Sequence, residues 1–424
     1  MDKVSEFIEN LKDHMIARKS EQYRWVALVL ITISVLMSMS LWFSATAIIP
    51  MIKTEWSLSS LETVFITLSL QLGFVVGTLI SATFAIPDSV NSRMLFAIAS
   101  ILGAFFNILY LFYGHIFSIG ILLRFLTGMS LAGVYPVAVQ LVSSWFPNRR
   151  GLAVGAVIAG LTVGSAIPEF ILSFNLIYSW ENVLEGSSIL AFISALIILF
   201  VLKDNPLKTK KSNFNWRLVR EVVKDKPTML ANIGYFGHMW ELYAMWTWIP
   251  VFLSISLLSY FPLKDYNFTV EILSFSVIGI AGLVGALFGG IIADRIGRTL
   301  STSIYLSISG FCAIFIGLTF RAIPIITVTI ALIWGAAVIA DSAQFSTAVT
   351  ELNPAYRTGS ALTFQMSIGF LVTIFSIYLV EFLQSLIGWR WSFDILAIGP
   401  IIGIISMLKL RSLPESLKMA HGRR

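Results

Sequence analysis

Long apolar runs follow one another along almost the whole chain, separated by short polar segments. Most of them extend over about 20 residues or more, the length that an α-helix needs to cross the hydrocarbon core of a bilayer. Strands of a membrane β-barrel would instead alternate apolar and polar positions over about 10 residues. The pattern therefore predicts an all-α polytopic membrane protein with twelve transmembrane helices. These lie at 25–51, 62–86, 94–114, 117–145, 151–176, 185–203, 228–257, 270–293, 299–320, 324–350, 358–385 and 391–410.

The composition supports a membrane protein and excludes several other classes. Of the 424 residues, 57% are hydrophobic and 12% are charged, whereas soluble domains carry about 25% charged residues. We therefore exclude a soluble enzyme, a disordered protein and a nucleic-acid-binding module. The single cysteine, Cys312, leaves no internal disulfide and no cysteine-based metal site. The sequence has no phosphate-binding glycine loop and no metal-ligand spacing of histidines or acids, so we expect no cofactor and no metal.

The distribution of lysine and arginine predicts how the helices are oriented. With twelve spans both termini lie on one side, and most of the 29 lysines and arginines fall in the tails and loops of that side. Positive residues accumulate on the cytoplasmic side of membrane proteins. We therefore expect a multi-pass protein of the plasma (inner) membrane with both termini in the cytoplasm. The net charge of +6 then reflects topology and contact with anionic lipid rather than nucleic acid. The opposite side holds Lys53, Lys264, Arg321 and Arg390.

A weak internal repeat divides the chain into two halves. The Asn-Arg-Arg-Gly turn at 148–151 recurs as Tyr-Arg-Thr-Gly at 356–359, and the first and seventh runs both end in Ile-Pro. Such an offset is expected of two six-helix repeats. Segments 2–20 and 215–226 place apolar residues on one helical face, which predicts helices at the membrane surface. The predicted parts are a cytoplasmic N-terminal segment at 1–24, a six-helix bundle at 25–203, a cytoplasmic linker at 204–227, a second six-helix bundle at 228–410 and a cytoplasmic tail at 411–424.

Two motifs resemble signatures of one transporter family. After the eighth run, Gly290-Ile-Ile-Ala-Asp294-Arg295-Ile-Gly297-Arg298 is similar to the cytoplasmic loop motif of the major facilitator superfamily. The fourth run carries Arg124-Phe-Leu-Thr-Gly128, which is similar to the fourth-helix motif of that family. The resemblance covers the whole chain and implies two pseudo-symmetric six-helix bundles around a central cavity, working by alternating access. It also implies that spans 1, 2, 4, 5, 7, 8, 10 and 11 line the cavity.

The loop motif is expected to act as a cytoplasmic gate. A carboxylate can favour the N-terminus of a neighbouring helix, and arginines can bridge to carboxylates or lipid phosphates. Contacts of this kind would hold the gate shut. The equivalent loop after the second run has its acidic residue displaced to Asp88, before Arg93, so we expect the lock to be asymmetric. The gate motif comprises Gly290, Asp294, Arg295, Gly297 and Arg298.

Ionisable side chains inside the apolar runs are the first candidates for function, because a charge at bilayer depth costs about 2.5–3.5 kcal/mol or more. Five ionisable residues lie well inside the runs, and all five fall on spans that the resemblance assigns to the cavity. We take them, with a glutamine one helical turn after the last, as the candidate substrate and proton pathway. The set is Arg124, Glu169, His238, Glu241, Asp341 and Gln344.

Two kinds of interaction are expected within this set. Arg124 and Glu169 lie at similar depth on adjacent antiparallel spans, so a salt bridge between them would neutralise two buried charges. Alternatively, Arg124 binds an anionic group of the substrate. His238, Glu241 and Asp341 lie near mid-membrane, and a histidine beside buried carboxylates can exchange a proton near neutral pH.

Aromatic residues are dense near these candidates. Trp42, Phe43 and Tyr243 are possible pocket aromatics for a small solute. Trp246 and Trp248 lie close to the end of their span, which fits membrane-interface anchors better.

The sequence thus predicts a secondary active transporter and not an enzyme. We expect it to move a small polar solute by proton-coupled alternating access, as a symporter, with a small organic or inorganic anion favoured by Arg124. The three buried carboxylates leave open a proton-coupled exporter of cationic or drug-like compounds. A third alternative is a non-transporting membrane sensor built on a transporter fold, although its tails are short. The expected partners are the solute, protons and the lipid bilayer, and a monomer suffices for this architecture.

Overall fold

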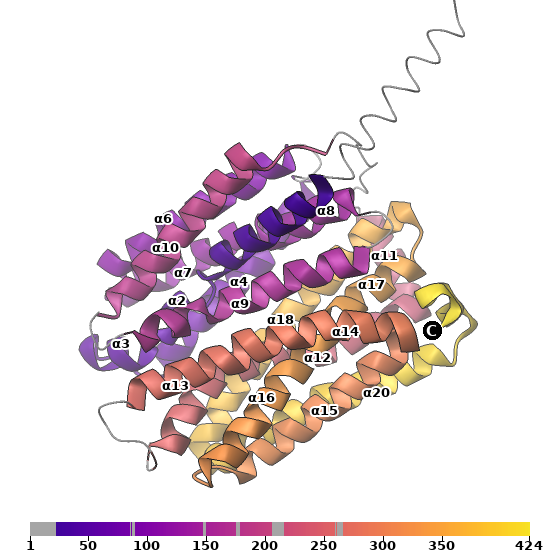
Figure 1. Cartoon of the computed structure of the whole chain (residues 1–424). Coiled ribbons are helices and arrows are strands. Elements are labelled where there is room, and N and C mark those ends of the chain that lie inside the picture. Colours follow the sequence, from indigo (N-terminus) through magenta and orange to yellow (C-terminus); the bar gives the residue numbers. More distant parts are fainter. Residues whose placement is uncertain are drawn as a thin grey trace, which may run out of the picture.

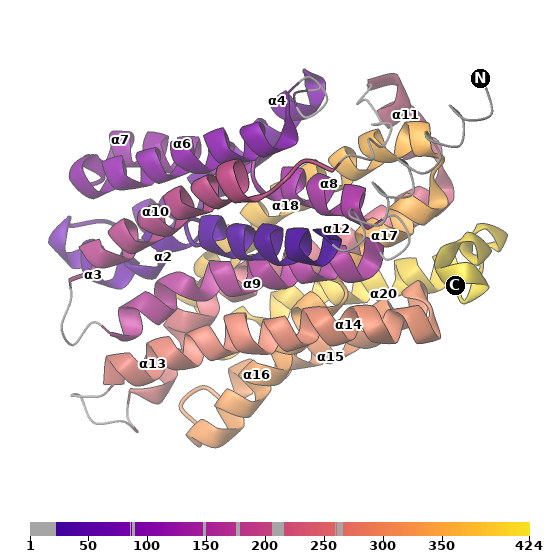
Figure 2. The same ribbon diagram turned by 45° about the horizontal axis from the view of Figure 1, so that its top comes forward.

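The fold was analysed in a computed structural model of the chain, which describes residues 23–84, 86, 90–146, 150–174, 179–205, 216–258, 260 and 266–424. In these ranges the regular structure is helical throughout, and the long helices run side by side, tilted against one another (Figures 1 and 2). Several predicted features lie outside the described residues. They are the surface helix at 2–20, Asp88, the turn at 148–149, the middle of the linker at 206–215, and Lys264.

The helices of the first half cover the first six predicted spans. A helical run at Tyr23–Met39 begins the half. It is followed by α2 (Ser44–Ala47), α3 (Ile49–Glu55), α4 (Ser60–Thr83), α6 (Ser92–Tyr113), α7 (Phe117–Leu131), α8 (Tyr135–Trp145), α9 (Arg150–Ser173), α10 (Glu181–Leu196) and the π-turn η1 (Ile197–Val201).

The second half contains the remaining spans and the C-terminal segment. Its elements are α11 (Trp216–Lys224), α12 (Lys226–Leu257), α13 (Tyr266–Phe275), the π-turn η2 (Ser276–Ala281), α14 (Gly282–Ile296), α15 (Arg298–Leu318), α16 (Pro324–Ala340), α17 (Ser342–Leu352), α18 (Ala355–Ile387), α19 (Trp389–Ser392), the 3-10 turn η3 (Asp394–Ala397), α20 (Ile398–Arg411) and the 3-10 turns η4 (Pro414–Gly422).

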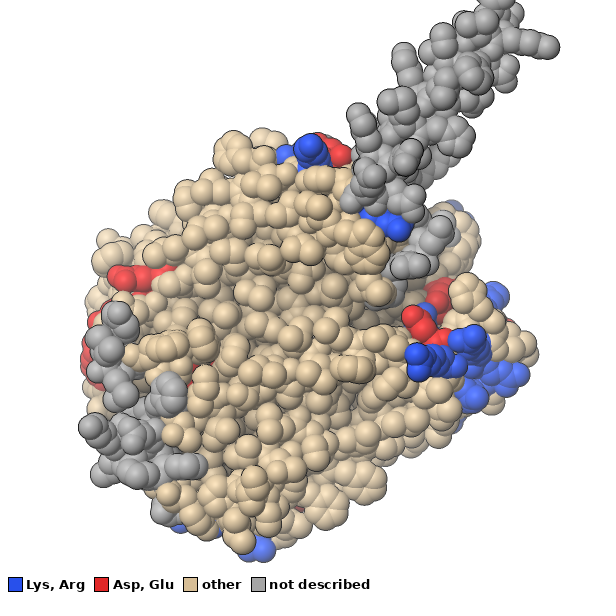
Figure 3. All heavy atoms as spheres, in the orientation of Figure 1, with Lys and Arg blue, Asp and Glu red and all other residues tan. Residues whose placement is uncertain are grey.

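Every predicted span coincides with helical structure, but the first and the seventh are not among the described helices that are both long and apolar enough to cross a membrane. In the described part of the chain, ten helices are long and apolar enough to cross a membrane. The first predicted span is missing from this set because its helix stops at Met39 and resumes at Ser44. The seventh, α12, is long enough to cross, but His238, Glu241 and its tryptophans make it less apolar. Figure 3 shows the resulting surface, on which charged side chains gather at the two ends and leave an uncharged band between them.

Glycines bring parallel helices into backbone contact inside each half. A Cβ atom on Gly73 of α4 would lie 2.0 Å from the carbonyl oxygen of Phe125 on α7, and one on Gly128 of α7 would lie 2.0 Å from that of Leu70 on α4. Only glycine permits such an approach. The second half repeats this reciprocal contact between α16 and the eighth span, which comprises α13, η2 and α14. There, Gly285 meets the carbonyl of Ala336 and Gly335 meets that of Val277.

The two halves meet along two seams. In one seam α4 packs against α18, where the rings of Phe74 and Phe370 lie 4.4 Å apart. In the other, α9 packs against α13, η2 and α14, and the rings of Phe170 and Phe275 lie 4.9 Å apart. The first seam joins spans 2 and 11, and the second joins spans 5 and 8. All four are spans that the family resemblance assigns to the lining of the cavity.

We predict that Gly285→Ala destabilises the protein by about 1–3 kcal/mol, because the added methyl group would meet the backbone of α16 and force the two helices apart. Gly290→Ala on the same helix is the matched control, since a Cβ there has its nearest neighbour at 3.9 Å. Thermal unfolding in detergent checks this. Equal melting temperatures for the two variants would contradict the close contact of α14 with α16.

Candidate functional site

Six aromatic rings from both halves lie together where the halves meet. Trp42 is in contact with Tyr243, with ring centroids 5.4 Å apart, and with Phe370 at 5.6 Å. Phe74 lies 5.0 Å from Trp42. All six rings are less than a tenth exposed. We call this group the aromatic cluster, and it consists of Trp42, Phe43, Phe74, Tyr243, Trp246 and Phe370.

The cluster contains the three pocket aromatics expected from the sequence and corrects one interpretation. Trp246 is not a membrane-interface anchor, because it is 1% exposed and its ring packs on Tyr243 at 5.4 Å and on Phe43 at 6.3 Å. Phe74 and Phe370 were not anticipated, since nothing distinguishes them in sequence from the chain's other phenylalanines.

Several polar atoms at the cluster are buried without a hydrogen-bond partner in the described part of the chain. They include the indole nitrogens of Trp42 and Trp246 and both amide atoms of Gln71 on α4. Buried polar groups normally find a partner, because leaving one unsatisfied costs about 1–3 kcal/mol. Together, the rings and these atoms offer an apolar surface with a few convergent polar groups, which is the usual make-up of a small-molecule site.

The position of Trp42 depends on a break in the first span. Residues 40–43 are not helical, so their carbonyl oxygens are not all accepted within a helix. Arg124 of α7 fills this gap. Its guanidinium donates to the carbonyl oxygen of Trp42 at 2.8 Å, to that of Leu41 at 3.3 Å, and to Oδ1 of Asn107 at 3.1 Å. In lipid, freed backbone groups must be satisfied by neighbouring helices, and Arg124 does this for the broken span.

The expected salt bridge between Arg124 and Glu169 is not formed. Among the described residues Arg124 has no acidic partner. Its guanidinium donates instead to backbone carbonyl oxygens and to the side-chain oxygen of Asn107. Glu169 on α9 is 8% exposed and lies within electrostatic range of Glu271 on α13, across the seam between the halves. Glu271 was not singled out from the sequence, because it lies at the very start of the eighth apolar run.

His238 and Asp341 form a buried pair in the second half. Nδ1 of His238 lies 2.8 Å from Oδ1 of Asp341, and both side chains are 1% exposed. Asp341 occupies the junction between α16 and α17, where the tenth span is interrupted. The imidazole also packs on the rings of Tyr235 and Phe345, at 5.9 Å and 5.6 Å.

Glu241 lies close to that pair but has partners of its own. Its two carboxylate oxygens accept hydrogen bonds from Nε1 of Trp334 at 2.7 Å and from the hydroxyl of Ser309 at 2.8 Å. These donors belong to α16 and α15. Glu241 therefore ties α12 to two other helices of the same half.

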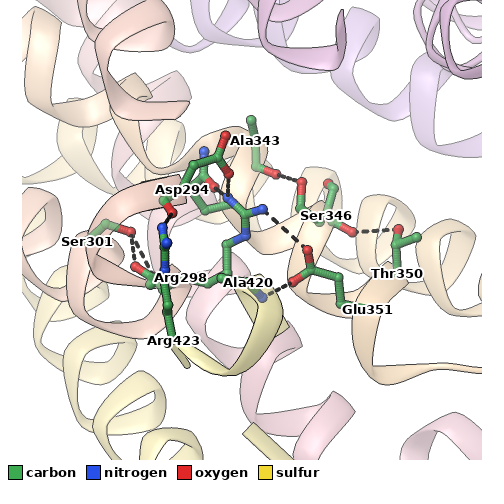
Figure 4. A network of polar contacts seen from close by, with 12 residues as sticks. Asp294, Arg298, Ser301, Ala343, Ser346, Thr350, Glu351, Ala420 and Arg423 are labelled. Atoms are coloured by element: carbon green, nitrogen blue, oxygen red, sulfur yellow. Dashed lines mark hydrogen bonds and ion pairs between the residues drawn. The ribbon is translucent and has the colours of Figure 1, made fainter. Parts of the chain in front are cut away.

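The gate motif forms a polar network at one end of the second half (Figure 4). The guanidinium of Arg298 donates to Asp294 at 2.7 Å, to the amide oxygen of Gln344 at 2.8 Å and to Glu351 at 3.3 Å. Arg298 therefore bridges to carboxylates, as expected. Arg295 is exposed, and a Cβ on Gly290 would find space.

The C-terminal segment joins this network. Gly297 adopts φ +96°, and a Cβ there would lie 2.0 Å from the carbonyl oxygen of Arg424. The guanidinium of Arg423 donates to the carbonyl oxygen of Asp294, and the backbone N–H of Ala420 donates to Glu351 at 3.1 Å. All these bonds join elements of the second half. Among the described residues the motif does not tie one half to the other, which differs from the expected gate lock.

Sequence comparisons were made with known proteins. A profile of the Major Facilitator Superfamily matches residues 30–377, which is most of the chain. The chain belongs to the Major Facilitator Superfamily. Among its relatives are the "Putative niacin/nicotinamide transporter NiaP" of Bacillus subtilis, 26% identical over 85% of this chain and 89% of that protein, and the 4-hydroxybenzoate transporter PcaK of Pseudomonas aeruginosa, 20% identical over 82% of each. The sialic acid transporter NanX of Escherichia coli is 24% identical over 41% of this chain and 42% of that protein.

Membership in the superfamily accounts for the multi-pass helical architecture. Outside the gate motif, each half also has an ion pair at the ends of its helices. In the first half, Arg93 pairs with Asp204 at 3.0 Å and donates to the carbonyl oxygen of Ile198. In the second half, Asp225 caps α12 through Thr228 and pairs with Arg357 at 3.3 Å. Partial burial would raise the pKa of Asp225, but the bonds from Thr228 and the charge of Arg357 outweigh it and hold this pKa below its ordinary value.

In the described part of the chain, no three His, Cys, Asp or Glu side chains are arranged so that they could hold a metal ion. The candidate residues form instead one aromatic cluster between the halves, one buried His–Asp pair beside it in the second half, and one buried arginine that supports the cluster from the first half.

We predict that Arg124→Gln lowers stability by about 3 kcal/mol or more, because hydrogen bonds from a charged donor to the broken first span are lost. Arg124→Lys keeps the charge without the planar fork, so its loss should be intermediate. Arg295→Gln is the matched control, since that side chain is exposed. Thermal unfolding of the purified variants gives the answer, and a wild-type melting temperature for Arg124→Gln would show that the break does not depend on this residue.

Proposed function

We propose that this protein is a proton-coupled secondary transporter that takes up a small aromatic carboxylic acid by alternating access. The observation that carries the proposal is the aromatic cluster, to which two spans of each half contribute rings. A flat aromatic substrate gains stacking contacts of about 0.5–1.5 kcal/mol per ring pair. Because the rings come from both halves, a substrate among them would be held by both and released when the halves rock apart.

The relatives support a carboxylic acid as substrate. NiaP, PcaK and NanX carry niacin or nicotinamide, 4-hydroxybenzoate and sialic acid in their names, and the first two are aromatic. The organic anion favoured by the sequence analysis agrees with these names. The reason differs, however, because Arg124 is occupied by backbone carbonyls and is not a free cation for the substrate.

Proton coupling is proposed to act through His238 and Asp341. The pair is buried, and it sits at a break in the tenth span, where a change of protonation can be coupled to a change in helix packing. Each unit of pH difference across the membrane contributes about 1.4 kcal/mol per proton, enough for useful accumulation of an acid. Operation in the plasma membrane with cytoplasmic termini, and as a monomer, belongs to the same proposal.

The first experiment measures uptake of labelled aromatic carboxylates by proteoliposomes with an inward proton gradient. We expect accumulation that disappears when the gradient is dissipated. Efflux of cationic or drug-like compounds instead would establish the exporter alternative. Absence of flux for every solute tested, with ligand binding retained, would favour the sensor alternative and overturn the proposal.

Phe370→Ala should raise the KM of uptake about tenfold, because it removes a ring that contacts three members of the cluster. Phe375→Ala is the matched control on the same helix, since its ring is 62% exposed. Saturation kinetics in proteoliposomes distinguish the two. Equal KM values would place the substrate elsewhere.

Asp341→Asn should abolish uptake driven by the proton gradient but preserve exchange of internal for external substrate, because exchange needs no net proton movement. The control is Glu415→Gln, an exposed carboxylate. Accumulation and exchange are measured in the same vesicles. Gradient-driven accumulation that survives in Asp341→Asn would remove the pair from the coupling mechanism.

A further inference from the structure

Gln71 faces the broken segment of the first span. Thr67 and Phe74 show which way this face of α4 is turned, since side chains three and four residues apart lie on the same face of a helix. Thr67, one turn before it, bonds the hydroxyl of Thr46 at 2.9 Å. Phe74, three residues after it, contacts Trp42 at 5.0 Å. Gln71 lies between Thr67 and Phe74 on the same face of α4, which is the face turned toward the segment that carries Trp42 and Phe43.

The amide of Gln71 has no partner at this place. The side chain is 0% exposed, and neither Nε2 nor Oε1 makes a hydrogen bond among the described residues. The indole N–H groups of Trp42 and Trp246, in the adjoining aromatic cluster, also lack acceptors. Three side chains that are nearly fully buried thus present one acceptor and several donors at the cluster, although buried polar groups are nearly always paired.

None of these polar atoms carries a charge. The nearest cation on the first half, Arg124, donates to the carbonyls of Leu41 and Trp42 and is used to hold the break. A carboxylate has acceptor oxygens only, so it would leave Oε1 of Gln71 facing another lone pair. A carboxamide or a protonated carboxylic acid offers one donor and one acceptor side by side. That pattern is complementary to the side-chain amide of glutamine, with two hydrogen bonds.

We infer that Gln71 is the specificity-determining residue of this site and pairs with the uncharged head group of an aromatic substrate, either a carboxamide or a protonated carboxylic acid. The inference rests on the proposed function, because it assumes that the ring of the substrate lies in the aromatic cluster. It goes further in stating which protonation state is bound. An aromatic acid would enter the site with its own proton, and an aromatic carboxamide would be accepted without one.

The test compares three ligands with the same ring: benzamide, which donates and accepts, methyl benzoate, which only accepts, and benzoate at pH 7.5. Dissociation constants are measured by calorimetry on the purified full-length protein. We expect the wild type to bind benzamide about tenfold or more tightly than either of the others. Gln71→Leu should bring the constants for benzamide and methyl benzoate together, while the ring still binds.

Two further variants make the result specific. Gln71→Glu, of the same shape, should keep a preference for benzamide over benzoate, because a carboxylate at this position accepts from the amide and repels the anion. It also serves if Gln71→Leu does not fold. Gln384→Leu, which removes a partly exposed amide from α18, should leave all three constants unchanged.

The outcomes separate this inference from the proposed function. If the aromatic ligands bind but Gln71→Leu leaves their ratio unchanged, the role of Gln71 is overturned and the proposed substrate class stands. If the wild type prefers benzoate, recognition of the uncharged head group is likewise overturned. If no aromatic ligand binds while another solute is transported, the proposed function itself fails.

Discussion

The arrangement of the site depends on one buried guanidinium. A helix broken inside a bilayer exposes carbonyl oxygens that water cannot reach, and each would be costly if left alone. Arg124, on a neighbouring helix, donates hydrogen bonds to these carbonyl oxygens and also to the side-chain oxygen of Asn107. The amide nitrogen of Asn107 in turn donates to the carbonyl of Leu184 and the hydroxyl of Ser188. Four spans of the first half are joined by this one network. Because the break is stable, Trp42 and Phe43 can leave the helical path and meet rings of the second half.

The second half solves a similar problem with the opposite charge. Glu241 on the seventh span accepts hydrogen bonds from residues of the ninth and tenth spans. In the first half, carbonyl oxygens of the first span accept from Arg124 on the fourth span, which also donates to Asn107 on the third. The spans correspond under the internal repeat. Each half thus contains a buried ionisable side chain, Arg124 or Glu241, whose described hydrogen-bond partners are neutral groups on helices of the same half. These contacts help to hold each half together, and His238 and Asp341 form a separate buried pair within the second half.

The lengths of the apolar runs were enough to predict the twelve spans, because bilayer thickness sets the length of a spanning helix. The family was indicated by two motifs that resemble its signatures. The ionisable candidates could also be found, since a charge in an apolar run stands out. Their partners could not. Depth along two helices suggested that Arg124 meets Glu169, but depth says nothing of rotation about the helix axis, and the residues point to different neighbours. Phe74, Phe370 and Gln71 escaped notice because phenylalanine and glutamine are unremarkable in such spans. Only the packing of distant helices reveals that they face one place.

The glycine contacts have a mechanical consequence. Inside each half, glycines such as Gly73 and Gly285 press directly on the backbone of the next helix, so those helices cannot slide without a clash. Between the halves the contacts are of another kind: the nearest neighbours of Gly279 and Gly282 are side-chain methyl groups, and a Cβ on Gly155 would lie 3.8 Å from the opposing carbonyl. Methyl groups and stacked rings can re-form contacts at several angles. The contacts between the halves are therefore of a kind that can re-form after a rotation of one half against the other, whereas the glycine contacts inside each half would clash.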